Sequence, residues 1–375
     1  MKKIIVLFCL SGMLSGCSVA VAMKRNDSVA GVQDSQGTKG SAGKIQDTPF
    51  GVLEFLSWNH SWNNFKYKDD SDLRKAVKLM KEAGVSIVRM DFYWNDIEPQ
   101  KGNFDFAKYD RIVELLSAGG IDILALLHYS AGWAAPEWNN PPDDSGDFVN
   151  YAEKTVSRYK DKIKYWELWN EPDSPVYWQP QDGMVKYSQL LKAVYPAIKK
   201  IDPSCKVLLG GLTNQGYFAL KNLYRLGGKG FFDIVNIHPF INPLEKDWPQ
   251  RVQSLHANIR RLMAEFGDGN KKIWFTEIGC PGVRWWGNDK KWWEGRAPSC
   301  GQQARFVADV YGRLLKLDGV EKIFWAFFRD NKDHFKDAVD YFGLVRWDFS
   351  RKPAFYAYKK AYSEWRKKTV GRPRQ

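Results

Sequence analysis

Two stretches of the sequence are the most informative, YWELWNEP at residues 165–172 and IWFTEIG at residues 273–279. Each is an apolar, strand-like run that ends near a glutamate, Glu171 in the first and Glu277 in the second. A carboxylate beside Trp, Leu, Ile and Phe is costly to bury without a partner. Two such glutamates therefore indicate chemistry rather than packing.

Before, between and after these two stretches, apolar runs alternate with amphipathic helical patterns. Strands are predicted at residues 50–56, 85–92, 121–127, 163–169, 206–210, 232–238, 272–277 and 320–327. Helices are predicted at residues 73–84, 106–118, 146–160, 184–200, 216–226, 248–266, 301–317 and 353–366. Eight such units predict an α/β fold, a single-domain (β/α)8 TIM barrel. A doubly wound open sheet is the alternative, disfavoured because no glycine-rich phosphate turn follows the first strand.

In a barrel, the C-terminal ends of different strands converge on one face, so Glu171 and Glu277 can meet there despite their distance in sequence. Cleavage of a glycosidic bond requires one protonated and one ionised carboxyl group flanking that bond. The pair therefore predicts a sugar-cleaving site. The longest connections follow strands and all carry Trp or Phe, at residues 129–145, 171–183, 239–247 and 279–300.

The segment VRMDFYWNDIEPQKGNFDFAKYD (88–110), followed by WELWNEPD (166–173) and Thr-Glu-Ile-Gly (276–279), resembles clan A of the retaining glycoside hydrolases. Within the clan it is most similar to family 39, and the resemblance covers residues 49–366. It implies that Glu171 is the acid/base, ending an Asn-Glu-Pro motif, and that Glu277 is the nucleophile. It implies no cofactor.

The neighbours of the two glutamates carry further expectations. Pro172 predicts an extended backbone at Glu171. Arg89, in the apolar run SIVRMDF, is expected to lie beside Glu277 and keep it ionised, because a nearby guanidinium lowers the pKa of a carboxylate. A structural ion pair of Arg89 with Asp91 or another acid is the alternative.

The resemblance also implies sugar contacts. Asn170 would bond the sugar 2-hydroxyl, and His128 and His238, which end the third and sixth strands, would bind hydroxyls or position a carboxylate. A plain turn residue and structural histidines are the alternatives. Many clan members place a Tyr near the end of the sixth strand, a phenol that His238-Pro239-Phe240 lacks.

Aromatic side chains are expected to supply stacking surfaces for sugar. Trp325 resembles the clan's eighth-strand tryptophan that forms the floor of the sugar site, with core packing as the alternative. Trp133 and Trp285, on two of the long connections, are also expected to contact substrate.

Cysteine and acid patterns give one expected disulfide and no metal site. Cys280 and Cys300 flank the long connection after the seventh strand and are expected to pair in an oxidising compartment. The sequence DDSGD (143–147) is superficially similar to a calcium loop but lacks the downstream Glu, so helix capping explains it better.

The N-terminal stretch MKKIIVLFCLSGMLSGCSVA (1–20) is typical of an export signal, and its apolar run is too short to span a membrane. Residues 14–17, Leu-Ser-Gly-Cys, resemble a bacterial lipobox, which implies a signal peptide at 1–16 and lipidation of Cys17. The mature protein would then be anchored in the cell envelope, at the outer membrane or in the periplasm of a Gram-negative host. A secretory signal cut near Ala20 or Ala22 is the alternative.

Composition predicts the segments that flank the barrel domain. Residues 17–48 have too few apolar side chains to form a core and are expected to be a disordered tether to a domain at 49–366, followed by a basic tail at 367–375. The net charge of +13 could favour anionic partners, but no nucleic-acid motif accompanies it, and distributed solvated charges are the alternative.

Together these features predict a monomeric, lipid-anchored, retaining glycoside hydrolase, endo-acting on a β-linked polysaccharide or oligosaccharide. An exo-acting β-xylosidase-like enzyme and a noncatalytic carbohydrate-binding lipoprotein are the alternatives.

Overall fold

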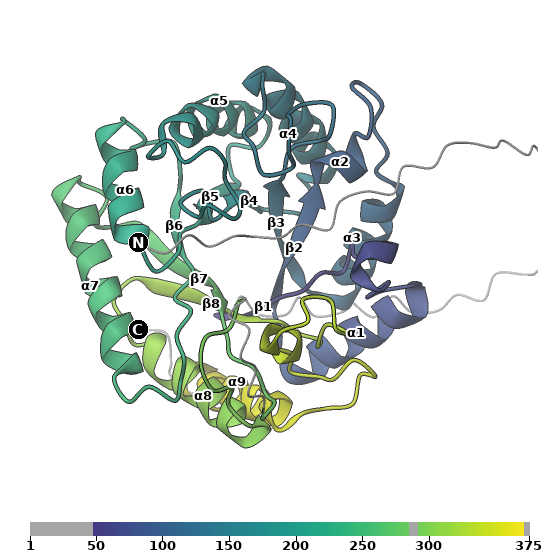
Figure 1. The fold of residues 1–375 in the computed structure, drawn as a ribbon, viewed down its shortest axis with the longest axis vertical. Helices are drawn as coiled ribbons and strands as arrows, with labels where there is room; N and C mark the ends of the chain where they lie inside the picture. The colour runs from purple at the N-terminus through teal and green to yellow at the C-terminus, as the bar shows by residue number, and fades with distance from the viewer. Residues whose placement is uncertain (1–47, 285–291, 371–375) are drawn as a thin grey trace, which may run out of the picture. The chain divides into compact units, whose positions relative to one another are not determined.

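The computed structural model describes residues 48–284 and 292–370, and in them eight parallel strands close into a barrel in sequence order (Figure 1). The strands are β1 (Phe50–Leu53), β2 (Ile87–Tyr93), β3 (Asp122–His128), β4 (Tyr165–Asn170), β5 (Lys206–Gly211), β6 (Ile234–Ile237), β7 (Lys272–Ile278) and β8 (Val320–Ala326). The (β/α)8 barrel is therefore confirmed. The open doubly wound alternative is wrong, because β1 pairs with both β2 and β8.

Helices surround the barrel (Figure 1). They are α1 (Asp70–Ala83), α2 (Trp94–Ile97), α3 (Ala107–Gly119), α4 (Ser145–Tyr159), α5 (Val185–Ile201), α6 (Gly216–Arg225), α7 (Trp248–Glu265), α8 (Cys300–Leu314) and α9 (Pro353–Val370). The short α2 and two 3-10 turns, η1 (Ser61–Asn63) and η2 (Ala338–Tyr341), lie in connections after strands and were not predicted. The first turn of α4 confirms capping at DDSGD, since the side chain of Asp144 accepts from Gly146 N at 2.8 Å.

Two layers fill the inside of the barrel. The lower layer is a separate hydrophobic cluster of Ile87, Leu124, Leu208, Ile234, Trp274 and Phe324. Successive strand residues point to opposite faces, so the residues two positions further along also point inward. On β2, β4, β6 and β7 these are polar: Arg89, Glu167, Asn236 and Thr276. A layer of buried polar residues therefore lies between this apolar cluster and the C-terminal ends of the strands.

The ends of the chain differ partly from expectation. Helix α9 runs to Val370, four residues past its expected end, so Lys367 and Lys368 belong to the last helix rather than to a separate basic tail. The expected signal peptide, Cys17, the expected tether up to residue 47 and the last five residues lie outside the described residues. None of the described helices is both long and apolar enough to cross a membrane.

Candidate active site

Glu171 directly follows β4, where the backbone turns sharply. Trp169 and Glu171 have φ of 68° and 43°, both in the left-handed region that non-glycine residues rarely adopt. The expected extended backbone at Glu171 is therefore wrong, although Pro172 follows it. Such strain is held only where surrounding contacts determine the conformation, and it occurs often at functional sites. Here it ends the regular alternation of β4 and turns the carboxyl group toward the barrel mouth.

The direction of the Glu277 side chain is set by a bulge in β7. Phe275 pairs with Ile323 and Ile278 pairs with Trp325, so three steps along β7 match two along β8. Without this irregularity Glu277 would point away from the barrel interior, because its neighbour Thr276 points inward. A bulge re-aims a side chain in this way, and bulges are common next to active sites.

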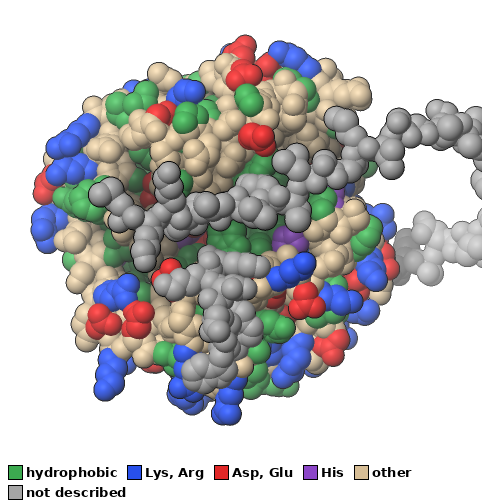
Figure 2. Space-filling model, viewed as in Figure 1, with side chains coloured by type: hydrophobic (Ala, Val, Ile, Leu, Met, Phe, Trp, Pro, Cys, Tyr) green, Lys and Arg blue, Asp and Glu red, His purple; other side chains and the backbone are tan. Residues whose placement is uncertain are grey.

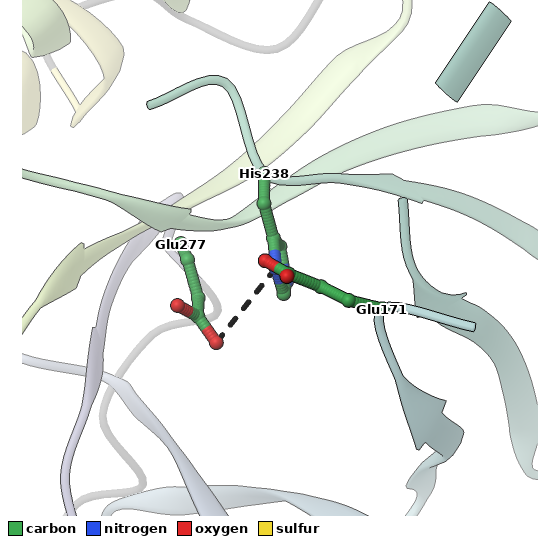
Figure 3. A group of neighbouring side chains, drawn as sticks. All are labelled: Glu171, His238 and Glu277. Carbon is green, nitrogen blue, oxygen red and sulfur yellow. Dashed lines mark hydrogen bonds and ion pairs between the residues drawn. The ribbon is translucent and has the colours of Figure 1, made fainter. Parts of the chain in front are cut away.

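Glu171, His238 and Glu277 converge from the ends of β4, β6 and β7 (Figure 3). One ligand atom from each lies within 4.8 Å of the others. His238 lies between the carboxylates, with Nδ1 2.9 Å from Glu171 Oε1 and 3.8 Å from Glu277 Oε1. Carboxylate oxygens this close are compatible with the separation of about 5 to 5.5 Å between the carboxyl groups of retaining glycosidases.

Arg89 holds Glu277 from below. Its Nη1 donates to Glu277 Oε1 at 2.5 Å, while Nε and Nη2 donate to Glu167 at 2.6 and 2.9 Å. The expected pairing with Glu277 is therefore present, and so is a structural ion pair, with Glu167 rather than Asp91. The guanidinium is 1% exposed, so its position is fixed by these carboxylates.

Asn170 is oriented by the same arginine. Its Oδ1 accepts from Arg89 Nη2 at 2.8 Å. Since the carbonyl end of the amide is taken, its NH2 group is the end left to donate to a ligand. That geometry fits the expected contact with a sugar hydroxyl.

The two carboxyl groups differ in their tendency to ionise. Burial, and then the nearby charge of Glu277, raise the pKa of Glu171 well above its ordinary value. Burial also raises the pKa of Glu277, to about 7, with Arg89 acting in the opposite direction. The site therefore favours a protonated Glu171 beside a more readily ionised Glu277, as an acid and a nucleophile require.

Hydrogen bonds through the polar layer fix the proton on His238. Asn236 Nδ2 donates to Glu167 Oε1 at 2.9 Å, so its Oδ1 faces Thr276 and accepts from the hydroxyl at 2.7 Å. The Thr276 oxygen can then only accept from His238 Nε2, 2.9 Å away.

Burial, with the charge of Arg89, lowers the pKa of His238 well below its usual value, so the ring is neutral. A neutral imidazole with its proton on Nε2 has a lone pair on Nδ1. The 2.9 Å contact with Glu171 Oε1 then requires the proton to come from the glutamate. His238 thus positions Glu171 in its protonated form, although it lacks the phenol that a tyrosine would supply at this place.

The same three residues are compact enough to hold a metal ion. The positive charge beside Glu277 is already supplied by Arg89, and Glu171 is held in its neutral form. The donor set therefore fits acid and base chemistry better than a cation site.

His128 is the last residue of β3. Its Nε2 is 3.0 Å from Asp91 Oδ1, but the two groups are not aligned as a hydrogen bond. The ring stacks on Tyr93, with centroids 4.9 Å apart. Burial lowers the pKa of His128, so the ring is neutral. Its expected contact with a sugar hydroxyl stays a prediction.

The predicted role of Trp325 as the floor of the sugar site is wrong. Trp325 is fully buried, lies against Phe306 of α8 with centroids 5.9 Å apart, and donates to Phe342 O at 2.9 Å. It faces the helix layer, so it packs the core and is not the floor of the site.

Trp133 donates to Glu98 O at 2.8 Å, and Lys101 lies over its ring, 5.5 Å from the centroid. Its expected contact with substrate stays a prediction. Trp285 lies outside the described residues.

The expected disulfide is also wrong. Cys280 and Cys300 are both free, as is the buried Cys205. Cys280 is packed in the core, whereas the thiol of Cys300, at the first turn of α8, donates to Gly282 O at 2.7 Å. The two thiols therefore have separate environments, although both flank the same connection.

Sequence reasoning missed two phenols at the site. Burial, and then the charges of Glu171 and Glu277, raise the pKa of Tyr177, which shows its closeness to both. The ring of Tyr129 stacks parallel to that of Tyr177, with centroids 6.2 Å apart. Both residues follow strands, and that position is the only signal the sequence carries for them.

Aromatic rings continue around the mouth of the barrel, where the centre is hollowed and lined by hydrophobic and histidine side chains (Figure 2). Consecutive members of this series lie 4.5 to 6.4 Å apart between centroids. We call it the aromatic rim: Trp138, Tyr177, Trp292, Phe335, His334 and Trp62. Trp62 and Trp292 are 56% and 45% exposed, so large ring faces remain open to a ligand.

Comparison with known sequences places this chain among the glycosyl hydrolases. The sequence profile of the glycosyl hydrolase catalytic core family matches residues 137–344, and a beta-galactosidase profile matches residues 62–140. A putative myrosinase of Arabidopsis thaliana is 29% identical over 143 residues, 35% of this chain and 26% of that protein. An aryl-phospho-beta-D-glucosidase of Bacillus subtilis is 33% identical over 150 residues, 36% of this chain and 29% of that protein. The chain thus matches less than a third of the length of either relative.

Solved structures share the fold. A family 39 glycoside hydrolase from Bacteroides cellulosilyticus has a TM-score of 0.67 and 24% identity, covering 84% of this chain and 63% of the other. A family 39 β-xylosidase from Caulobacter crescentus has a TM-score of 0.63 and 17% identity, covering 85% and 72%. The expected similarity to family 39 is confirmed at the level of the fold.

Proposed function

This chain belongs to the glycosyl hydrolase catalytic core family, and on that premise we propose that it is a retaining glycoside hydrolase acting on β-linked glycans outside the cytoplasm. The observation that carries the proposal is the convergence of a neutral Glu171, held by His238, with Glu277, held by Arg89. This is the arrangement that double displacement needs at one anomeric carbon.

In the first step, Glu277 attacks the anomeric carbon while Glu171 gives its proton to the leaving oxygen. The glycosidic C–O bond breaks as the bond between sugar and Glu277 forms. Esterification removes the negative charge of Glu277, one of the causes that raise the pKa of Glu171. Glu171, now ionised, faces a less negative site and can act as a base.

In the second step, Glu171 takes a proton from water as the water oxygen attacks the same carbon. The ester to Glu277 breaks, and both residues return to their starting forms. Two inversions at one carbon give net retention of configuration.

The aromatic rim supports a polymeric substrate and endo-action. Trp62, Trp138 and Trp292 come from connections after β1, β3 and β7, so exposed rings surround the mouth on several sides. Indole and phenol faces suit the apolar faces of pyranose rings. A single closed sugar pocket would not need stacking surfaces so widely distributed.

We further propose that the protein is monomeric and lipid-anchored through Cys17 in the cell envelope. The support is the lipobox-like stretch at residues 14–17, which follows a positively charged and then apolar start. Mass spectrometry of the N-terminal peptide of protein taken from membranes tests this, since a diacylated Cys17 has a defined added mass.

The deciding experiment follows the first product of hydrolysis by proton NMR on a panel of β-linked glycans. We expect the β-anomer to appear first and the α-anomer only by later mutarotation. A first product in the α-form would remove the double-displacement mechanism. Glu171→Gln and Glu277→Gln are the controls, and each should lose at least about 1,000-fold in kcat.

The same panel separates the alternatives. Endo-action lowers the viscosity of a polymer well before many reducing ends appear, whereas a β-xylosidase-like exo-enzyme releases single sugars first. The fold shared with a β-xylosidase is the observation that keeps the exo-acting candidate. Binding without turnover on every glycan would favour the noncatalytic lipoprotein.

A further inference from the structure

The charge of the protein is divided between the two ends of the barrel. We call the end where helices connect to the following strands the floor, and the opposite end, with the carboxylates, the mouth. The connection from α4 to β4 reads KDKIK at residues 160–164, and exposed lysines recur in the later floor connections or at the ends of the helices and strands that they join. They are Lys200, Lys206, Lys229, Lys272 and Lys316.

Acidic groups neutralise only part of the floor: Lys162 pairs with Glu114, Lys164 with Asp202 and Lys199 with Asp233. Asp233 accepts from Val207 N at 2.8 Å, Asp268 accepts from Tyr224 at 3.0 Å, and Asp318 pairs with Arg260 at 2.6 Å. By contrast, the five floor lysines named above form no ion pair within the described part of the chain. The floor therefore presents a surplus of exposed positive charge.

At the mouth, the connections after β2, β3 and β4 contain more acidic than basic residues. Residues 129–144 contain three acids, Glu137, Asp143 and Asp144, and residues 171–184 contain Glu171, Asp173 and Asp182. Neither stretch contains Lys or Arg. On the mouth side, Lys and Arg side chains lie mostly around the outer edge (Figure 2). A basic polymer-binding mouth is therefore not what the +13 net charge represents.

The chain also enters the barrel at its floor. Thr48, the first described residue, bonds Ser86 at 2.8 Å and accepts from Lys322 Nζ at 3.0 Å, both at the starts of strands. The described chain therefore begins at the basic end of the barrel.

We propose that the floor docks on an anionic lipid surface and that this contact points the mouth away from the membrane. The inference goes beyond the proposed activity, since it requires no turnover. It also does not depend on a lipid attached to Cys17. Lysines near an anionic bilayer each strengthen binding by about fivefold, and salt screens the effect. Docking by the floor would leave the aromatic rim free to meet a glycan in the medium.

The test uses the mature chain from residue 17, carrying Cys17→Ser so that no lipid is attached. The described strands and helices begin at Phe50, so the shortened chain keeps all of them. Co-sedimentation is measured with vesicles of about 30% phosphatidylglycerol in phosphatidylcholine, and with phosphatidylcholine alone. We expect binding to the anionic vesicles only, falling as salt rises from about 50 to 300 mM.

Two charge-matched variants separate the floor from net charge. Lys200→Glu with Lys229→Glu changes the floor, and Lys68→Glu with Lys246→Glu makes the same charge change at exposed mouth positions. We expect the floor variant to lose at least tenfold in vesicle binding and the mouth variant to change less than twofold. Equal losses would overturn the proposal, as would failure of the parent to bind anionic vesicles. Hydrolysis of a soluble glycan should be the same in all three proteins, so failure of docking and failure of the proposed activity are distinguishable.

Discussion

Arg89 Nη1 donates to Glu277 Oε1 at 2.5 Å, across 188 positions of sequence. The other nitrogens of the guanidinium are held by Glu167 and Asn170, so the group cannot follow Glu277 if the carboxylate moves. One planar cation thereby fixes the positions of Glu277 and Asn170. A lysine, with a single point charge, cannot hold three partners in that geometry.

We therefore expect Arg89→Lys to lower kcat/KM by roughly 100-fold or more, because the nucleophile loses its fixed position. The acidic limb of the pH profile should also move to higher pH, since the cation that opposes the rise in the pKa of Glu277 is weakened. Steady-state kinetics across pH measure both effects. Arg158→Lys, at an exposed pair with Asp110, is the matched control and should leave both values unchanged.

The pH dependence of the parent enzyme follows from the two carboxyl groups. Catalysis needs Glu277 ionised, so kcat/KM should fall as pH decreases through about 7, the pKa to which burial raises this group. It needs Glu171 protonated, so the rate should fall again at higher pH, above the raised pKa of Glu171. An optimum near pH 4 to 5, where an unperturbed Glu titrates, would contradict this account.

The hydroxyl of Thr276 sets the proton on His238, and Thr276→Val removes it. His238 could then carry its proton on Nδ1 and donate to an ionised Glu171, which lowers the pKa of Glu171. We expect the alkaline limb of the pH profile to shift down by roughly one pH unit. Thr276→Ser keeps the hydroxyl and should keep the limb in place.

A purely structural role of Thr276 predicts a different result. Loss of the hydroxyl leaves buried groups on His238 and Asn236 unsatisfied, which costs about 1 to 3 kcal/mol in the free energy of unfolding. Thermal unfolding would record that cost. An unfolding change without a shift of the alkaline limb would exclude the positioning role.

The strand order and the two glutamates could be predicted because they depend on local patterns: apolar runs at regular spacing and a carboxylate at the end of two of them. The direction of Trp325 could not. In a barrel both faces of a strand are apolar, so the sequence does not distinguish a side chain inside the barrel from one beneath the helices.

Other parts of the site arise from departures from regular geometry. The bulge at Glu277 and the positive φ of Glu171 are set by contacts with distant strands, which no local pattern contains. Asn236 and Thr276 have the appearance of ordinary strand residues, and only the fold brings them beneath His238. Tyr129 and Tyr177 lie in connections, where periodicity carries no information.

The buried position of Trp325 gives a prediction that separates packing from sugar contact. Trp325→Phe leaves a void against Phe306 and removes the bond to Phe342 O, so the free energy of unfolding should fall by about 1 to 3 kcal/mol. KM for short and long glycans should stay within twofold of the parent. Denaturant titration and steady-state kinetics measure these, and a large rise in KM at unchanged stability would return Trp325 to the sugar site.

Trp292 on the aromatic rim tests whether the enzyme acts on long chains. Its ring is 45% exposed and stacks near Tyr177, with centroids 6.0 Å apart and planes inclined by 23°. A sugar unit bound beyond the cleavage point could lie on that face, whereas a short aryl glycoside would not reach it. Trp292→Ala should therefore raise KM for the polymer by about fivefold to tenfold, since one aromatic contact contributes about 1 kcal/mol. KM for a short aryl glycoside should not change. Tyr356→Ala, which removes a 58% exposed ring on the outer helix α9, is the matched control. Equal effects of Trp292→Ala on both substrates would mean that the rim stabilises the mouth without binding the chain, and the case for endo-action would lose its support.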